Sequence, residues 1–260
     1  MPDNHGAIVF CAIEQFATTS CEPGRRVAVL CCVAMKLLRR LRRLFAPDPN
    51  RFLRSARGVI HVGANVGQER ELYRGYGLDV LWIEPIPDVF ARLRANIAGF
   101  PRQHALECLV TDRDDASYEF NVANNDGESS SILALKEHRD VWPEVRFTRT
   151  IALRSSTLAT LLTRESVDVA RYDALVMDTQ GSELLVLRGA EPVLGQFKFI
   201  KTEVPDFEAY AGCAKLEDIE RFLRHRGYDE LARNRFASRP GGGHYYDVVY
   251  GKGLTSKERI

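Results

Sequence analysis

The sequence predicts an α/β fold built on a mostly parallel sheet, and three observations support this prediction. From Gly58 onward, short β-branched segments alternate with segments of helical periodicity, as in strand–helix–strand units. The first strand breaks into a glycine-containing turn, Gly63 to Gly67, that leads toward a helix. The second strand ends in an acid, Glu84. Since ligands bind beyond the carboxyl ends of the strands in such sheets, we expect the functional site there.

The expected elements follow one another along the chain. The strands are expected over 58–62, 80–84, 105–110, 118–122, 147–153, 174–177, 197–204 and 245–250. The helices are expected over 65–75, 88–97, 156–162, 184–194 and 216–226. Pro87 opens the second helix, because proline suits the first helical turn. Ser155 or Ser156 is expected to cap the third.

The composition is that of one α/β domain with a short extension. The chain has 260 residues, of which 45% are hydrophobic and 27% are charged. We expect a basic extension over 1–50 and the domain over 51–260. The net charge is +1, which argues against nucleic acid as a partner. The six cysteines show no C-x-x-C spacing, so we expect reduced thiols, no zinc site and a cytoplasmic location.

Basic residues are concentrated at the N-terminal end. Residues 1–57 hold ten Lys or Arg side chains against four acids. In the segment 36–45, leucines and Phe45 fall on one side of a helix and the basic side chains fall on the other. Two interpretations are open. One is a helix at the inner face of a membrane, with peripheral contact through residues 35–45, and the other is a helix packed on the domain.

The start of the chain permits a further interpretation. The apolar run 27–35 is too short to span a bilayer, and no cleavage site for a signal peptide is evident. Met35 is an alternative start codon, which would make residues 1–34 a mis-called extension. The stretch from Pro47 to Asn50 is expected to link the extension to the domain.

The glycine spacing indicates which cofactor the first turn holds. The dinucleotide fingerprint is G-x-G-x-x-G, in which the middle glycine makes room for a pyrophosphate. Here Asn65 stands at that middle position and would crowd a pyrophosphate. We therefore expect S-adenosylmethionine rather than NAD, with Glu84 placed to accept the ribose hydroxyls. The alternative is a glycine turn that binds no ligand.

Three segments resemble the FkbM family of S-adenosylmethionine-dependent methyltransferases. They are V-I-H-V-G-A-N-V-G from Val59, W-I-E-P-I-P from Trp82 and V-M-D-T-Q-G-S-E-L-L-V-L-R-G-A from Val176. The resemblance, over about Arg57 to Lys252, implies a Rossmann-like class I fold with a seven-stranded sheet and a late antiparallel strand. It also implies O-methylation of sugars or polyketide-like products. One position departs from the family: an acid that would help to hold the cofactor's ammonium group is replaced by His61.

The candidate site residues come from these motifs and from the strand ends. Asp178 is our first choice for a catalytic or substrate-orienting group, with the N-cap of the following helix as its alternative. Glu203 is the second catalytic candidate. No dedicated metal spacing accompanies it, so we assign no metal ligands, and a divalent metal that bridges Asp178 and Glu203 stays an open alternative. Asp112 is expected to accept from the adenine amino group or to cap a loop. The residues expected to bind the cofactor are His61, Gly63, Ala64, Asn65, Gly67, Glu84, Pro85, Thr111, Asp112 and Asp178.

The acceptor side is less defined by the sequence. A general base contributes roughly 10²–10⁴-fold to transfer to a hydroxyl, and Asp178, His138 or His244 could serve. The loop 124–131 and the segment 138–142 carry small polar groups and one indole, which suit a small molecule or glycan as acceptor. Two other functions stay open: a non-catalytic binding module with this fold, and an NAD-dependent oxidoreductase. The sequence predicts no oligomeric state.

Overall fold

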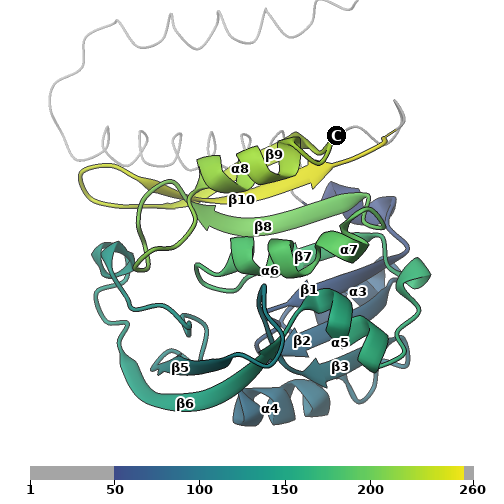
Figure 1. The fold of residues 1–260 in the computed structure, drawn as a ribbon, viewed down its shortest axis with the longest axis horizontal. Helices are drawn as coiled ribbons and strands as arrows, with labels where there is room; N and C mark the ends of the chain where they lie inside the picture. The colour runs from purple at the N-terminus through teal and green to yellow at the C-terminus, as the bar shows by residue number, and fades with distance from the viewer. Residues whose placement is uncertain (1–49, 255–260) are drawn as a thin grey trace, which may run out of the picture. The chain divides into compact units, whose positions relative to one another are not determined.

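A seven-stranded sheet forms the centre of the fold in this computed structural model, which describes residues 50–254. In spatial order its strands are β3 (Gln103–Glu107), β2 (Asp79–Glu84), β1 (Gly58–Val62), β7 (Ala174–Met177), β8 (Phe199–Pro205), β10 (His244–Gly251) and β9 (Asp229–Ser238). The first five are parallel, and β10 runs antiparallel to both β8 and β9 (Figure 1). The predicted class, with its mostly parallel seven-stranded sheet and late antiparallel strand, is confirmed.

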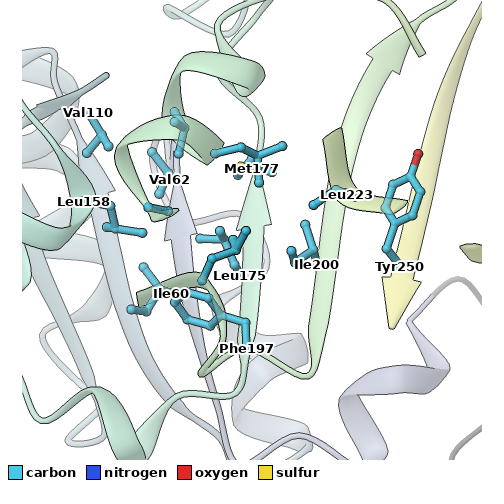
Figure 2. Close-up of a cluster of buried hydrophobic side chains, with 14 of the residues drawn as sticks. Ile60, Val62, Val110, Leu158, Leu175, Met177, Phe197, Ile200, Leu223 and Tyr250 are labelled. Atoms are coloured by element: carbon cyan, nitrogen blue, oxygen red, sulfur yellow. The ribbon is translucent and has the colours of Figure 1, made fainter. Parts of the chain in front are cut away.

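Helices cover both faces of the sheet, because successive residues of a strand point to opposite sides. Ile60 and Val62 of β1 pack toward one face, in the cluster shown in Figure 2, and Val59 packs toward the other. Each buried apolar side chain contributes about 1.5–3 kcal/mol, so the strand ends are firmly held. The helices of the first face are α5 (Leu158–Arg164), α6 (Glu183–Gly189), α7 (Glu191–Leu194) and α8 (Leu216–Arg224). Those of the second are η2 (Arg51–Arg54), α3 (Arg70–Gly75) and α4 (Pro87–Ile97).

A smaller sheet is inserted between β3 and β7 in the chain. Its strands lie in the order β4 (Leu109–Val110), β6 (Phe147–Ser156) and β5 (Ser117–Ala123). The prediction of a single strand over 105–110 is wrong. The strand β3 ends at Glu107, and Leu109 and Val110 pair with β6 instead. Apolar residues stand on both sides of Glu107, so the pattern of the run does not reveal that the chain changes sheets at Cys108.

The turn after β1 is longer than predicted. The helix expected over 65–75 begins only at Arg70. Asn65 and Gly67 have positive φ angles of 44° and 72°, which lie outside the right-handed helical region. The residues from Gly63 to Glu69 are therefore available to line a ligand site rather than to form a helix.

Other boundaries also differ from the prediction. The helix expected over 184–194 is divided into α6 and α7, because Pro192 suits the first turn of a new helix rather than the interior of a long one. The cap of α5 is Thr157, whose hydroxyl accepts from the backbone N–H of Thr160 at 3.1 Å, and neither serine fills that position. Strands β1 and β7 have the predicted ends, and the other predicted strands and helices α4 and α8 have small shifts of their ends.

Strand β9 is absent from the sequence-based prediction. It is an edge strand that pairs with β10, and most of its side chains are exposed. Its sequence, D-E-L-A-R-N-R-F-A-S, lacks the alternation of apolar residues that indicates a strand with one buried face. Pairing with β10 rather than burial places these residues in the sheet.

Gly63 lets the turn after β1 approach the end of β7 closely. Its φ is 78°, and a Cβ atom there would lie 1.8 Å from the backbone oxygen of Asp178. We expect Gly63→Ala to lower the free energy of unfolding by more than about 2 kcal/mol, as measured by denaturant unfolding, because both strain and contact are unfavourable. Gly77→Ala is the matched control, with φ 68° and no atom within 4 Å of the added Cβ. Equal losses in the two variants would contradict the role of this contact.

Part of the prediction lies outside the described residues. The basic extension expected over 1–50, including the segment 35–45 and the alternative start at Met35, belongs almost wholly to residues 1–49, which the structure does not describe. The membrane contact therefore stays a prediction. Among residues 50–254, no helix combines the length and apolar character needed to cross a bilayer.

Candidate active site

A cavity of about 430 Å³ lies at the carboxyl ends of β1, β2 and β7. It is lined there by Gly63, Glu84 and Asp178, each of which directly follows or ends one of these strands. The chain order reverses between β1 and β7, and this switch point is where open α/β sheets bind their ligands. The volume is within the range of small-molecule sites.

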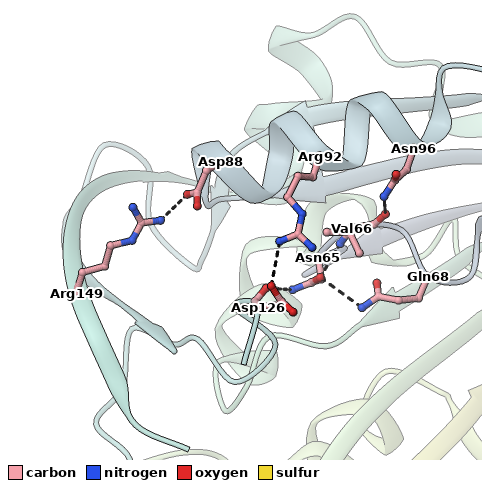
Figure 3. Close-up of polar contacts among 8 residues, drawn as sticks. All are labelled: Asn65, Val66, Gln68, Asp88, Arg92, Asn96, Asp126 and Arg149. Atoms are coloured by element: carbon pink, nitrogen blue, oxygen red, sulfur yellow. Dashed lines mark hydrogen bonds and ion pairs between the residues drawn. The ribbon is translucent and has the colours of Figure 1, made fainter. Parts of the chain in front are cut away.

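The turn after β1 forms one wall of the cavity and is closed by the Asn65 side chain. Its Oδ1 accepts from the backbone N–H of Val66 at 2.7 Å, and its Nδ2 donates to the backbone oxygen of Asp126 at 3.1 Å (Figure 3). Arg92 of α4 pairs with the Asp126 carboxylate at 3.3 Å. These contacts join the turn, α4 and the loop 124–131. The place of a dinucleotide fold's middle glycine is thus filled by a bonded side chain.

Glu84 is buried at the end of β2 and lines the cavity. Its Oε2 accepts from the backbone N–H of Asn65 at 2.8 Å, and its Oε1 accepts from that of Ile86 at 3.0 Å. Burial raises the pKa of Glu84 to about 7, although the two backbone donors act in the opposite direction. A carboxylate oxygen accepts more than one hydrogen bond, so this fixed group can also receive a ligand's hydroxyls.

His61 is buried beside a carboxylate that the sequence analysis missed. Its ring stacks on Trp82 with centroids 5.1 Å apart, and its Nδ1 lies 3.2 Å from the Tyr73 hydroxyl. Burial lowers the pKa of His61, while the nearby charge of Glu69 acts to raise it. Glu69 also lines the cavity. The expected helix over 65–75 makes Glu69 an ordinary helix residue, and only the longer turn reveals its place.

Asp178 follows β7 directly and is held by a chain of hydrogen bonds. Its Oδ1 accepts from Nε2 of Gln180 at 2.5 Å, and Oε1 of Gln180 accepts from the Tyr210 hydroxyl at 2.7 Å. Burial raises the pKa of Asp178 to about 7, the carboxylate of Glu183 acts in the same direction, and the bond from Gln180 opposes them. The N-cap alternative is wrong, because the residue at that position of α6 is Ser182. One Asp178 oxygen is fixed and the group lines the cavity.

Glu203 lies on β8 and lines the same cavity as Asp178. Burial raises the pKa of Glu203 well above its usual range, and the carboxylates of Asp178 and Asp247 act in the same direction. Glu183 instead accepts from the backbone N–H groups of Thr179 and Gly181, at 3.0 and 3.1 Å. Within residues 50–254, no group of three or more His, Cys, Asp or Glu side chains is arranged to hold a metal ion.

The raised pKa of Glu203 predicts a pH-dependent stability. A carboxyl group whose pKa is higher in the folded than in the unfolded protein stabilises the fold at low pH, and this contribution is lost as the pH rises through the folded value. We therefore expect Glu203→Gln to raise the melting temperature of the ligand-free protein at pH 8, by about 2 °C or more, and to change it little at pH 4. Glu217→Gln, an exposed position on α8, is the control. A lower melting temperature at pH 8 would show that Glu203 stabilises the fold.

The family assignment agrees with this geometry. The sequence matches the methyltransferase FkbM domain over residues 61–230, more than half of the chain. The chain belongs to this family. The matched range begins at His61 and contains Glu84, Asp178 and Glu203. The resemblance inferred from the three sequence motifs is therefore confirmed.

The FkbM domain is also similar to solved methyltransferase structures. A putative tRNA (m1A22) methyltransferase from Streptococcus pneumoniae, in complex with S-adenosyl-L-methionine, has 11% identity and a TM-score of 0.43 over 79% of this chain and 74% of that one. Magnesium protoporphyrin IX methyltransferase from Synechocystis has 9% identity and a TM-score of 0.40, over 75% of this chain and 69% of that one. 1,6-Didemethyltoxoflavin-N1-methyltransferase from Burkholderia thailandensis has 14% identity and a TM-score of 0.40, over 91% of this chain and 92% of that one. No curated protein sequence matches the chain.

Most of the predicted cofactor residues line the cavity of the FkbM domain. Those that do are His61, Gly63, Ala64, Asn65, Glu84, Pro85 and Asp178. Gly67, Thr111 and Asp112 do not. A Cβ atom at Gly67 would lie 2.8 Å from Leu93, so this glycine allows the turn to pack on α4.

Thr111 and Asp112 do not line the cavity, and β3 ends earlier than predicted. Cys108, Leu109 and Val110 line the cavity instead. The Thr111 hydroxyl is bonded to the backbone of Arg113, and Asp112 lies 4.0 Å from the Arg113 guanidinium. A role of Thr111 and Asp112 in cofactor binding stays a prediction that this geometry does not support.

The insert between β5 and β6 completes the cavity of the FkbM domain. Its loop 124–131 and its segment around Trp142 both contribute lining residues. His138 is buried there, with Nδ1 2.6 Å from the Tyr245 hydroxyl and Nε2 3.1 Å from the Ser129 hydroxyl. Burial lowers the pKa of His138 to about 4. Since both ring nitrogens are occupied, His138 supports the wall rather than accepting a proton.

The two remaining residues differ from the prediction in opposite ways. His244, a candidate base in the sequence, is absent from the cavity lining, and its Nδ1 lies 2.9 Å from the Ser238 hydroxyl. Phe236 of β9 lines the cavity although no sequence motif indicated it. Its strand was missed, so the sequence offered no signal for its position.

Proposed function

We propose that this FkbM domain is an S-adenosylmethionine-dependent methyltransferase that acts on a hydroxyl of a sugar, a glycan or a related natural product. The observation that carries the proposal is the presence of Glu84 and Asp178 in one cavity of a methyltransferase family member, at the ends of β2 and β7, the strands on either side of β1. The first suits the binding of a ribose, and the second suits a base. The predicted cytoplasmic location, with the basic segment 35–45 at the inner membrane face, would suit lipid-linked glycans.

The residues present fit the cofactor. Ile86, Leu109 and Phe120 belong to one hydrophobic cluster and line the cavity, as an adenine ring requires. Glu69 and Asp178 offer carboxylates to an ammonium group, and Glu69 replaces the acid that the family has at position 61. When bound, S-adenosylmethionine supplies a methyl group on a sulfonium, which is a strong electrophile.

Asp178 takes the proton of the acceptor hydroxyl in this proposal. A hydroxyl is a weak nucleophile, so transfer to oxygen benefits from a base within reach. The raised pKa makes Asp178 a stronger base than an ordinary aspartate, at the cost of a smaller ionised fraction below pH 7. The Gln180 bond orients the carboxylate and favours its ionised form.

The alternatives are weaker. An NAD-dependent oxidoreductase needs room for a pyrophosphate, and the bonded Asn65 side chain stands where that room would be. His61 is the one feature that favours a binding module without catalysis. The carboxylates expected of an active site, Glu84 and Asp178, both line the cavity. Turnover discriminates between these functions.

The test is a transfer assay with S-adenosylmethionine carrying a labelled methyl group and a panel of neutral glycosides and polyols. Release of S-adenosylhomocysteine measures turnover, and NMR of the product locates the methyl group. We expect methylation at oxygen. Methylation at nitrogen would overturn the choice of acceptor atom, and cofactor binding without transfer to any acceptor would support the binding module.

A further inference from the structure

The cavity has an aromatic wall that is separate from the cluster around Glu84. Trp142 and Phe236 line it, and both pack on Tyr245, with ring centroids 5.1 and 5.8 Å apart. Tyr245 is buried, and it also contacts His138 and Phe207. The wall thus joins the insert between β5 and β6 to the β9–β10 hairpin. Its rings are fixed from behind and face the cavity.

Phe236 is exposed in a way that packing does not explain. Its side chain is 42% exposed, and among the described residues no other large hydrophobic side chain is exposed. An aromatic ring at the rim of a cavity offers its face to the C–H face of a ligand ring. This position suits the acceptor rather than the cofactor, whose adenine has its own apolar residues at Ile86, Leu109 and Phe120.

The charges that line the cavity are of one sign. Six carboxyl groups line it, from Glu69, Glu84, Glu128, Glu144, Asp178 and Glu203, and no Lys or Arg among the described residues does so. Burial raises the pKa values of Glu84, Asp178 and Glu203, which lowers their ionised fractions near neutral pH, so repulsion of an anionic ligand falls chiefly to Glu69, Glu128 and Glu144. Glu128 and Glu144 are exposed, and Glu144 is two residues from Trp142. A cleft of one sign repels ligands of the same sign, and like charges brought together oppose binding.

We propose that the acceptor is a sugar ring without an anionic group, neutral or amine-bearing, which stacks on Trp142 and Phe236 while the carboxylates exclude phosphorylated and carboxylated rings. This inference rests on the proposed methyltransferase function and defines its acceptor. Hydroxyls of the ring would meet the polar lining groups of Asn125, Ser129 and Gln180. Nucleotide-linked sugars and nucleic acids are excluded by the same charges.

The test uses three probes that share one ring and differ in charge: methyl glucoside, methyl glucosaminide and methyl glucuronide. Each is titrated into the protein saturated with S-adenosylhomocysteine, and the tryptophan emission is followed. The chain has two tryptophans, and Trp82 is fully buried, so the response reports on Trp142. We expect the neutral and amine-bearing probes to bind at least about tenfold more tightly than the uronate. Equal or tighter uronate binding, or no response to any probe, would overturn the proposal.

Variants separate the two parts of the proposal. Glu144→Lys should weaken the discrimination against the uronate. Glu128→Gln should act in the same direction, and it replaces the first variant if that one is unstable. Phe236→Leu should weaken the binding of the glucoside. Phe222→Leu, on α8 outside the cavity, should leave that binding unchanged. Unchanged glucoside binding in Phe236→Leu would contradict the stacking.

Affinity for S-adenosylhomocysteine is measured on the same samples. If that affinity is absent, the methyltransferase proposal fails, whatever the sugars do. If it is intact and the charge preference is absent, only the acceptor assignment fails.

Discussion

Asp178→Asn is expected to lower the turnover number at least about tenfold while the protein keeps its fold and its affinity for S-adenosylhomocysteine. The amide is close in shape to the carboxylate, but it cannot accept the proton of the acceptor hydroxyl. Gln180 would face either the amide oxygen or the amide nitrogen, so the bond at 2.5 Å can be kept by a rotation of the side chain. Steady-state kinetics and calorimetry on the same protein measure the two effects.

The pH profile adds a second readout for Asp178. Since a base must be ionised, the turnover of the native protein should fall as the pH drops through about 7, the value to which burial raises this pKa. That limb should be absent from the residual activity of Asp178→Asn. Asp229→Asn, at the exposed start of β9, is the control and should behave as the native protein. Full activity in Asp178→Asn would remove Asp178 from the mechanism, and loss of ligand affinity would assign it to the cofactor.

Glu84→Gln is expected to weaken S-adenosylhomocysteine binding at least about tenfold, which corresponds to about 1.4 kcal/mol. Both carboxylate oxygens accept backbone N–H groups, at 2.8 and 3.0 Å. A glutamine has one oxygen, so its NH₂ group would face a backbone donor and a ribose hydroxyl would lose its acceptor. Calorimetry gives the dissociation constant.

Glu107→Gln is the matched control for Glu84→Gln. Glu107 lies opposite Glu84 in the register of β2 and β3, but it is exposed and does not line the cavity. We expect the affinity of Glu107→Gln for S-adenosylhomocysteine to stay within about twofold of the native value. If Glu84→Gln also bound normally, the ribose would have to be held by another residue.

The fold was predictable where burial leaves a pattern in the sequence. Strand β1 is buried at every position and strand β7 likewise, and both were placed with their correct ends. An edge strand with exposed side chains leaves no such pattern, so β9 was missed. Nor does the run 105–110 reveal a change of sheet, so the end of β3 was misplaced, and Asp112, expected at that strand end, does not line the cavity.

The site was predictable where a motif fixes a strand end. Glu84 ends β2 and Asp178 follows β7, and the ends of both strands were correctly predicted, so both residues were found. The position of Glu69 depends on the positive φ angles of Asn65 and Gly67 in the turn, and the sequence does not predict such an angle for Asn65. Phe236 depends on the hairpin of β9 and β10, which brings a residue far along the chain to the cavity. Such long-range placement is a property of the whole fold rather than of any segment.

The identity of the cofactor is the central claim. Titration calorimetry of the purified protein with S-adenosylmethionine, S-adenosylhomocysteine and NAD tests it most directly. We expect about micromolar dissociation constants for the two adenosyl ligands and no heat with NAD. Binding of NAD would contradict the assignment of this cavity and favour the oxidoreductase. No binding of either adenosyl ligand would also contradict it and would direct attention to His61 as the cause.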